Sequence, residues 1–199
     1  MQCIAGAITP TQGQINFAGR DVTSQRPDER AQAGLSIKFQ INSVLPMLSV
    51  YDNILLAMQT RGSTLDLLRS RSRKALHPRI MAALERFKLI GRAETLAEEL
   101  SHGEQQWLEI AMALASEPRL LLLDEPTAGM SLEERKVTGE LLEPLRDSCA
   151  LVIVEHDLDF IRDLCDQLTV LDQGRVVGTG TVAEIQQNPR VQEVFLTRV

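Results

Sequence analysis

The clearest pattern of apolar and polar positions lies in residues 105–123. Residues 105–116 carry apolar side chains at helical spacing, and Pro118 predicts the end of that helix. Residues 120–123 are an unbroken run of leucines, which is typical of a strand covered on both faces in a parallel sheet. The pattern therefore predicts a helix followed by a central buried strand. The apolar positions of the predicted helix are Trp107, Ile110, Ala111 and Leu114.

Two adjacent acids, Asp124 and Glu125, end the predicted leucine strand. Ligands of open α/β sheets bind at the carboxyl ends of the strands. An acid in the first position can hold Mg²⁺ or its waters, and the next acid can orient or deprotonate an attacking water. On its own this pair is a weak signal, because strands often end in solvated acids.

Two further strands are predicted to end at the same edge. Residues 35–39 form a strand that delivers Gln40, whose amide could coordinate Mg²⁺ or the attacking water. Residues 150–154 are predicted to be another buried strand, and His156 follows it. The stretch between Glu125 and His156 has room for one crossover helix, so both side chains should reach the same sheet edge.

The rest of the chain alternates short strands, turns and helices. His77 precedes Pro78 and is interpreted as the start of a helix. A capping box is predicted at Thr181. The other predicted elements are a short strand at 14–18, a turn at 19–21, helices at 27–33, 76–89, 131–146, 157–163 and 188–196, and a hairpin of strands 168–171 and 175–178.

Composition narrows the possible function classes. The chain has 199 residues, is 44% hydrophobic and carries a net charge of −6, so it lacks the basic footprint of a nucleic-acid-binding protein. The basic cluster at residues 69–74 is interpreted as a solvated face. No apolar run is long enough to span a bilayer and no signal peptide is visible, so membrane association would require a partner. The cysteines are predicted to be reduced thiols: Cys3, Cys149 and Cys165.

Four motifs in this order resemble the ATP-binding subunits of ABC transporters. Residues 100–104 (LSHGE) resemble the LSGGQ signature, and residues 120–125 resemble Walker B. His156 is similar to the switch histidine and Gln40 to the Q-loop glutamine. The resemblance covers nearly the whole chain.

The resemblance implies an α/β fold: a RecA-like P-loop NTPase core with a mainly parallel sheet, plus a helical subdomain. The core would comprise residues 1–40 and 99–199. Residues 41–98 would form the helical subdomain, which carries the Q-loop and the surface that docks on the membrane subunits.

The resemblance also implies that ATP and Mg²⁺ are the cofactors and that the chain is an ATPase. Asp124 and Gln40 would bind the metal. The catalytic residues would be Glu125 as the base, His156 as the switch and Gln40 as the sensor.

The signature residues Ser101, Gly103 and Glu104 would contact the ATP held by a second subunit. His102 departs from the family pattern because it stands where the signature has its first glycine. Glu104 places negative charge near the expected phosphate unless it points away as a first-turn helix residue. Residues 128–131 occupy the place of the D-loop with an unusual sequence.

The partners implied are a second ATP-binding subunit in a homo- or heterodimer, transmembrane permease subunits and, indirectly, a periplasmic or extracellular substrate-binding protein. Residues 48–56, the signature helix and the end of the chain are similar to importers of branched-chain amino acids, urea and short amides. The expected place is the cytoplasmic side of the cell membrane, peripherally bound through the permease. No nucleic-acid partner is expected.

The phosphate-binding string G-x-x-x-x-G-K-[ST] does not occur in the sequence, and residues 1–6 resemble the helix that follows it in ABC proteins. A misassigned start, a truncated gene and a fragment all stay open as explanations. As written, the chain alone is expected to be inactive, whereas a heterodimer with an intact relative would have one complete site. The alternative function is a non-catalytic chain that contributes only its signature to a partner's ATP site. ABC proteins of translation or DNA repair are a third class, but their tandem domains or coiled coils are missing here.

Overall fold

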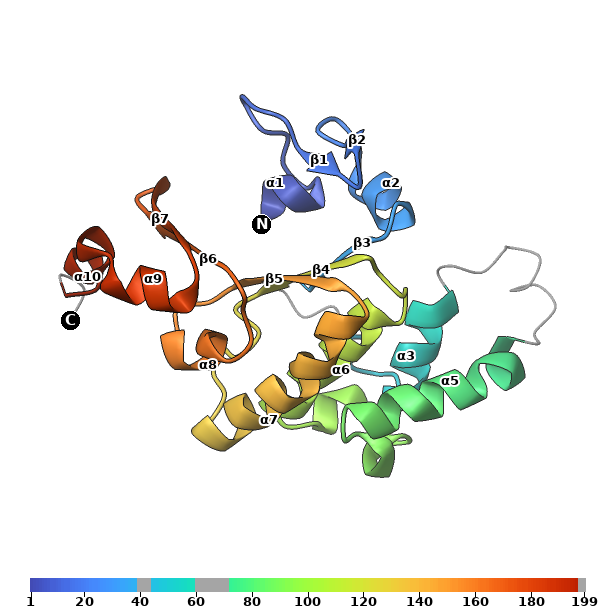
Figure 1. Ribbon diagram of the computed structural model, residues 1–199. Helices are drawn as coiled ribbons and strands as arrows, with labels where there is room; N and C mark the ends of the chain where they lie inside the picture. Colours follow the sequence, from blue (N-terminus) through green and yellow to red (C-terminus); the bar gives the residue numbers. More distant parts are fainter. Residues whose placement is uncertain (39–43, 60–71, 197–199) are drawn as a thin grey trace. The chain divides into compact units, whose positions relative to one another are not determined.

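The protein is described from a computed structural model that places residues 1–38, 44–59 and 72–196 (Figure 1). The chain divides into two compact units, Met1–His156 and Asp157–Val199, and each is described by itself. No helix in the described ranges combines the length and the apolar character needed to cross a bilayer.

A three-stranded parallel sheet organises the first unit, with the order β3-β4-β5. The strands are β3 (Leu35–Lys38), β4 (Leu120–Asp124) and β5 (Ala150–Val154). Their predicted positions are confirmed. The strands are parallel and nearly level, since Leu120 pairs with both Leu35 and Ala150. Their carboxyl ends therefore meet at one edge.

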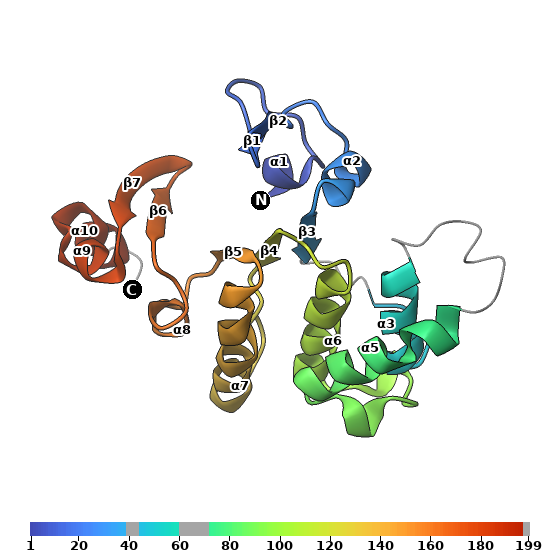
Figure 2. The ribbon, with the colours of Figure 1, turned by 45° about the vertical axis from the view of Figure 1, so that its right-hand side comes forward.

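The middle strand, β4, is buried on both faces, as its run of leucines predicted. Leu121, Leu122 and Leu123 are fully buried. Leu122 packs in a cluster with Ala5 of helix α1 (Gln2–Ala5) on one face. The alternating positions point to the opposite face, which α6 (His102–Leu114) and α7 (Leu132–Leu142) cover (Figure 2).

The prediction that β5 is buried is wrong. Val152 and Val154 are 39% and 43% exposed. Val152 pairs with Leu122 and so points to the face on which α1 lies, but the α1 cluster contains residues of β3 and β4 and none of β5. Within the described residues no strand pairs with the far edge of β5.

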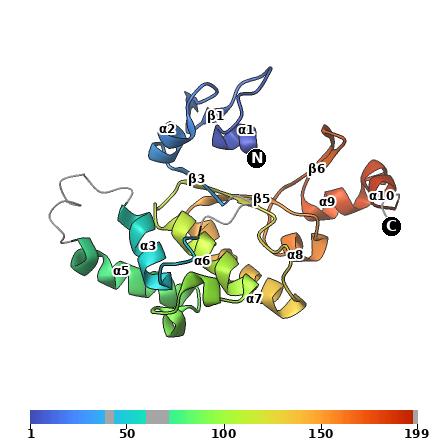
Figure 3. The same ribbon diagram turned by 180° about the vertical axis from the view of Figure 1, so that it is seen from behind.

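Helices dominate the described parts of residues 44–100. The elements are α3 (Val50–Gln59), α5 (Ser72–Arg86) and two short 3₁₀ helices, η1 (Ile90–Arg92) and η2 (Ala97–Glu99). Helix α3 packs against both α5 and α6, an arrangement also visible from behind (Figure 3). The interpretation of His77 as a helix start is wrong: α5 begins at Ser72 and continues through Pro78. The Nδ1 atom of His77 lies 3.0 Å from the Tyr51 hydroxyl.

The segment before β3 forms a small hairpin and a helix. Strands β1 (Asn16–Phe17) and β2 (Arg20–Asp21) pair antiparallel. Strand β1 is shorter than the strand predicted at 14–18, and the turn predicted at 19–21 is partly strand. Helix α2 (Pro27–Gln32) begins at its proline, as expected.

A buried hydroxyl joins α6 to α7. Thr138 is fully buried; its Oγ1 accepts a hydrogen bond of 2.9 Å from the indole Nε1 of Trp107 and lies 2.8 Å from the carbonyl oxygen of Glu134.

The helix predicted at 131–146 is divided in two after Leu142. There α7 gives way to the 3₁₀ helix η3 (Glu143–Asp147), which has a proline in its first turn. Proline lacks the N–H that would continue the α-helical pattern.

We expect Thr138→Val to destabilise the protein by about 1–2 kcal/mol, because the substitution keeps the shape but leaves the Trp107 N–H without its acceptor. Urea unfolding followed by tryptophan fluorescence measures this loss, since Trp107 is the chain's only tryptophan. Thr169→Val, at an exposed position in the second unit, is the control. Equal stability of the Thr138 variant and the wild type would contradict the expectation.

The second unit is a hairpin with three helices. Strands β6 (Leu168–Asp172) and β7 (Arg175–Gly180) are antiparallel and turn at Gln173 and Gly174, both with positive φ. The helices are α8 (Leu158–Arg162), α9 (Val182–Gln187) and α10 (Pro189–Leu196), and the predicted capping box at Thr181 starts α9. A small core joins them: Ile161, Leu168, Ile185 and Val191.

Candidate functional site

The two acids at the end of β4 lie next to the end of β5. Asp124 pairs with Val154 in the sheet register, and the Glu125 backbone N–H donates to the Val154 carbonyl at 2.9 Å. Glu125 has a φ of 47°, which lies in the left-handed region that residues other than glycine rarely adopt. The sheet therefore ends at Asp124, and Glu125 begins a sharp turn beside the residues that follow β5.

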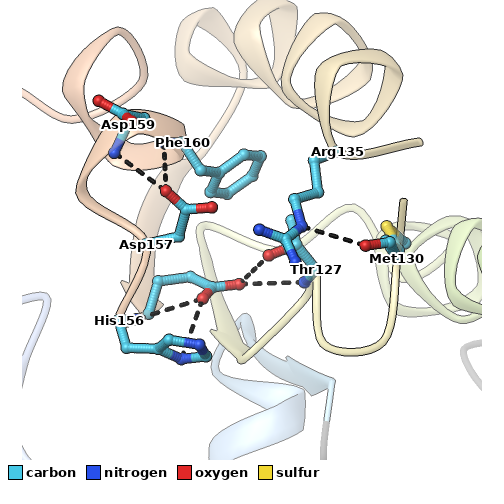
Figure 4. A network of polar contacts seen from close by, with 8 residues as sticks. Thr127, Met130, Arg135, His156, Asp157, Asp159 and Phe160 are labelled. Atoms are coloured by element: carbon cyan, nitrogen blue, oxygen red, sulfur yellow. Dashed lines mark hydrogen bonds and ion pairs between the residues drawn. The ribbon is translucent and has the colours of Figure 1, made fainter. Parts of the chain in front are cut away.

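A carboxylate that the sequence analysis assigned no role joins these two strand ends. The side chain of Glu155 is only 1% exposed. Its Oε1 accepts hydrogen bonds from the backbone N–H and the hydroxyl of Thr127, at 3.0 and 2.6 Å (Figure 4). Its Oε2 accepts from the His156 backbone N–H at 3.2 Å. Glu155 thus links the turn after β4 to the segment that carries His156.

His156 presents its ring to the outside, with 80% of its side chain exposed. Its Nδ1 lies 3.8 Å from Oε2 of Glu155 (Figure 4). The parallel sheet thus brings the backbones of Asp124, Glu125 and His156 to one edge. Gln40, the remaining residue predicted for this edge, lies outside the described residues.

The signature residues form the first turn of α6. The helix begins at His102 rather than at the predicted position 105, with Ser101 as its N-cap. The Ser101 hydroxyl accepts from the Glu104 N–H at 3.3 Å, and the Glu104 carboxylate accepts from the Ser101 N–H at 2.9 Å. The Glu104 carboxylate also lies 3.4 Å from Nε of Arg92. Glu104 therefore caps its own helix and pairs with a cation.

Gly103 is buried against the start of α7. A Cβ atom at this position would collide with the carboxylate of Glu134. That carboxylate accepts from both the backbone and the hydroxyl of Ser131, and these two hydrogen bonds hold the pKa of Glu134 below its ordinary value. A side chain at position 103 would therefore have to displace the Glu134 carboxylate from its contacts with Ser131.

The nearby His102 ring contacts the residues in the place of the D-loop. Its Nε2 lies 3.0 Å from the Ala128 carbonyl oxygen. A Cβ atom at Gly129 would lie 3.1 Å from the same nitrogen. Two of the places where the sequence departs from the family pattern, His102 and the residues in the place of the D-loop, therefore touch each other.

The residues present fit a magnesium ion bound together with a nucleotide. Within the described residues no group of three potential ligand side chains could hold a metal alone. Mg²⁺, however, is usually held by one or two carboxylates plus waters and substrate phosphates. Asp124 would supply such a carboxylate at the carboxyl edge of the sheet, where ligands of open α/β sheets bind.

Comparison with known proteins places the chain in a family. The family model for ABC transporters matches residues 1–128. The chain belongs to the ABC transporter family. The resemblance to ABC transporter ATP-binding subunits is confirmed, and the chain is an ATP-binding domain of that family.

Relatives with different substrates resemble this ABC domain about equally. The high-affinity branched-chain amino acid transport ATP-binding protein LivG of Salmonella typhimurium is 30% identical, over 98% of this chain and 80% of that protein. The methionine import protein MetN of Carboxydothermus hydrogenoformans is 30% identical over 95% of this chain and 55% of its own length. The ribose import ATP-binding protein RbsA 1 of Burkholderia thailandensis is 32% identical over 98% of this chain and 40% of its own length.

Solved structures confirm the predicted α/β P-loop NTPase fold. MJ1267, an ATP-binding cassette of an ABC transporter, superposes with a TM-score of 0.84 at 25% identity, over 98% of this chain and 81% of that one. The cbiO1 protein of Clostridium perfringens, part of the cbiONQ transporter complex, gives a TM-score of 0.78 at 26% identity, over 98% and 76%.

Proposed function

We propose that this ABC domain is the ATP-binding and ATP-hydrolysing subunit of an importer for branched-chain amino acids or for urea and related amides. One observation carries the catalytic part: the parallel register that brings the backbones of Asp124, Glu125 and His156 to one sheet edge. The resemblance to LivG over nearly the whole chain supports the amino acid substrate. The methionine and ribose importers among the relatives are the competing substrate classes.

The chain's own side chains would divide the work of hydrolysis. Bound Mg²⁺–ATP supplies the phosphoryl group that is transferred and the cation that neutralises its charge. Asp124 and Gln40 would hold the metal. Glu125 would orient and deprotonate the attacking water, and His156, with its exposed ring, would donate a hydrogen bond to the γ-phosphate.

A second ATP-binding subunit would complete the site. Ser101 and Gly103 would face the nucleotide bound by that subunit, as the family resemblance implies. The negative charge of Glu104 is compatible with a phosphate near Ser101, because its carboxylate is held by the Ser101 N–H and lies beside Arg92. The phosphate-binding loop itself would come from a segment outside these 199 residues, since they do not contain the string.

The proposed division of the chain follows from the same function. Residues 1–40 and 99–199 would form the nucleotide-binding core. Residues 41–98 would dock on the permease, which would hold the subunit on the cytoplasmic side of the membrane. Exposed apolar side chains next to α3 suit such docking: Leu45, Met47, Leu48 and Leu56.

The test uses this chain coexpressed with a P-loop-bearing ATP-binding subunit and the permease. Ser101→Ala should lower the ATPase rate of the assembly about 10-fold or more, the value of a hydrogen bond to a charged group. Thr181→Ala is the matched control, because Thr181 caps α9 with the same capping box. An equal loss in both variants would assign Ser101 to helix capping alone and contradict its role at a nucleotide.

A further inference from the structure

We propose that Glu155 is a positioning residue for hydrolysis: it clamps the turn 125–130 onto the end of β5 and so holds Glu125, while His102 holds the same turn from the signature side. The inference rests on the proposed role of Glu125 in ATP hydrolysis. None of the sequence motifs assigns a role to Glu155.

The carboxylate of Glu155 is fully engaged by backbone and side-chain donors. Thr127 donates both its N–H and its hydroxyl to one oxygen, and the His156 N–H donates to the other. The side chain is almost completely removed from solvent. Charge-assisted hydrogen bonds at a buried carboxylate are stronger than neutral ones and fix geometry.

The turn needs an external hold because its conformation is unfavourable by itself. Glu125 has a positive φ, which costs a residue with a side chain about 1 kcal/mol or more. The hydrogen bonds within the turn are local ones, from Ala128 to Glu125 and from Met130 to Thr127. Glu155 adds the tie between this turn and the neighbouring strand end.

Two further contacts hold the same turn. His102 contacts the Ala128 carbonyl at 3.0 Å, and Gly129 leaves room for the ring. Arg135 of α7 donates from Nε to the Met130 carbonyl at 3.2 Å (Figure 4). The turn that begins with Glu125 therefore contacts the end of β5, the start of α6 and α7.

The clamp makes a short continuous path from the signature, through the turn that begins with Glu125, to His156. The path runs from His102 to Ala128, along the turn to Thr127, and through Glu155 to His156. A nucleotide that engages the signature would thereby bias the position of Glu125 within the same chain. Each of these contacts lies inside the first compact unit.

Hydrogen exchange on the purified chain tests the clamp without any nucleotide. The Glu125 amide, which donates to Val154, reports on the position of the acid directly. In Glu155→Ala we expect this amide to exchange about 10-fold faster or more, and in Glu155→Gln, which keeps the acceptor for Thr127, much less. Glu143→Ala, an exposed glutamate in η3, is the control and should change nothing. Unchanged exchange of the Glu125 amide in Glu155→Ala would overturn the proposal.

ATPase kinetics of the assembled transporter separate positioning from plain structural support. Glu155→Ala should lower kcat about 10-fold or more while KM for ATP changes less than about 3-fold. Thr127→Val should lower kcat less, and the double variant should be no worse than Glu155→Ala, because both changes break one contact. Reduced thermal stability with an unchanged kcat would overturn the positioning role. A wild-type assembly without ATPase activity would instead overturn the proposed function, and hydrogen exchange would still decide the clamp.

Discussion

Replacing Glu125 with glutamine should lower ATP hydrolysis about 100-fold or more at the site that this chain's strand edge forms together with a phosphate-binding loop. The substitution keeps size and hydrogen bonding but removes the carboxylate that would accept a proton from the attacking water. General-base catalysis typically contributes about 10²–10⁴-fold to rate. Nucleotide binding should persist, because the glutamine side chain has nearly the same size as glutamate and leaves the space at the sheet edge unchanged. The measurement pairs steady-state ATPase rates with equilibrium binding of ATP.

Glu117→Gln provides a closely matched control for this experiment. Glu117 precedes β4, as Glu125 follows it, and it also has a positive φ, of 45°. It forms an exposed ion pair with Arg79, which contributes little to stability. Wild-type activity in Glu125→Gln, combined with a loss in Ser101→Ala, would support the alternative function: a chain that supplies only its signature to a partner's site.

The sheet and its acidic edge could be predicted because their signals are local. An unbroken run of four leucines before two acids indicates a buried parallel strand whatever surrounds it. A single crossover helix and the parallel arrangement then place the backbones of Glu125 and His156 at the same edge. The exposure of β5 could not be predicted in this way, because it depends on how far α1 extends across the sheet.

The contacts that hold the site were missed because they join distant positions. In the sequence Glu155 is an ordinary polar residue at a strand end. Its burial is a tertiary feature, because Thr127, which donates two hydrogen bonds to its carboxylate, is distant in the sequence. The contact of His102 with Ala128 could have been suspected from two departures from the family pattern, but a departure shows no distance. Pairings of this kind are decided by tertiary structure rather than by local pattern.

Replacing Arg30 with methionine should destabilise the protein by about 3 kcal/mol or more. In the sequence Arg30 is one more basic residue in a short helix, but the structure leaves it only 1% exposed. Its guanidinium donates to four backbone carbonyls: Cys3 at 2.5 Å, Ile4 at 2.8 Å, Thr23 at 2.9 Å and Gln25 at 3.1 Å. Two of these carbonyls belong to the carboxyl end of α1, where the helix dipole favours a cation.

The cost of losing Arg30 comes from the acceptors left behind. Each buried polar group that loses its partner costs about 1–3 kcal/mol, and methionine fills the space without supplying a donor. Arg26→Met is the control on the same segment, since its ion pair with Asp28 is exposed and should contribute less than about 1 kcal/mol. Urea unfolding of the purified chain, followed by Trp107 fluorescence, compares the two variants. Similar unfolding midpoints and slopes for both would show that Arg30 is not what ties α1 to α2, whereas the expected difference would identify a buried cation as the link between these two helices.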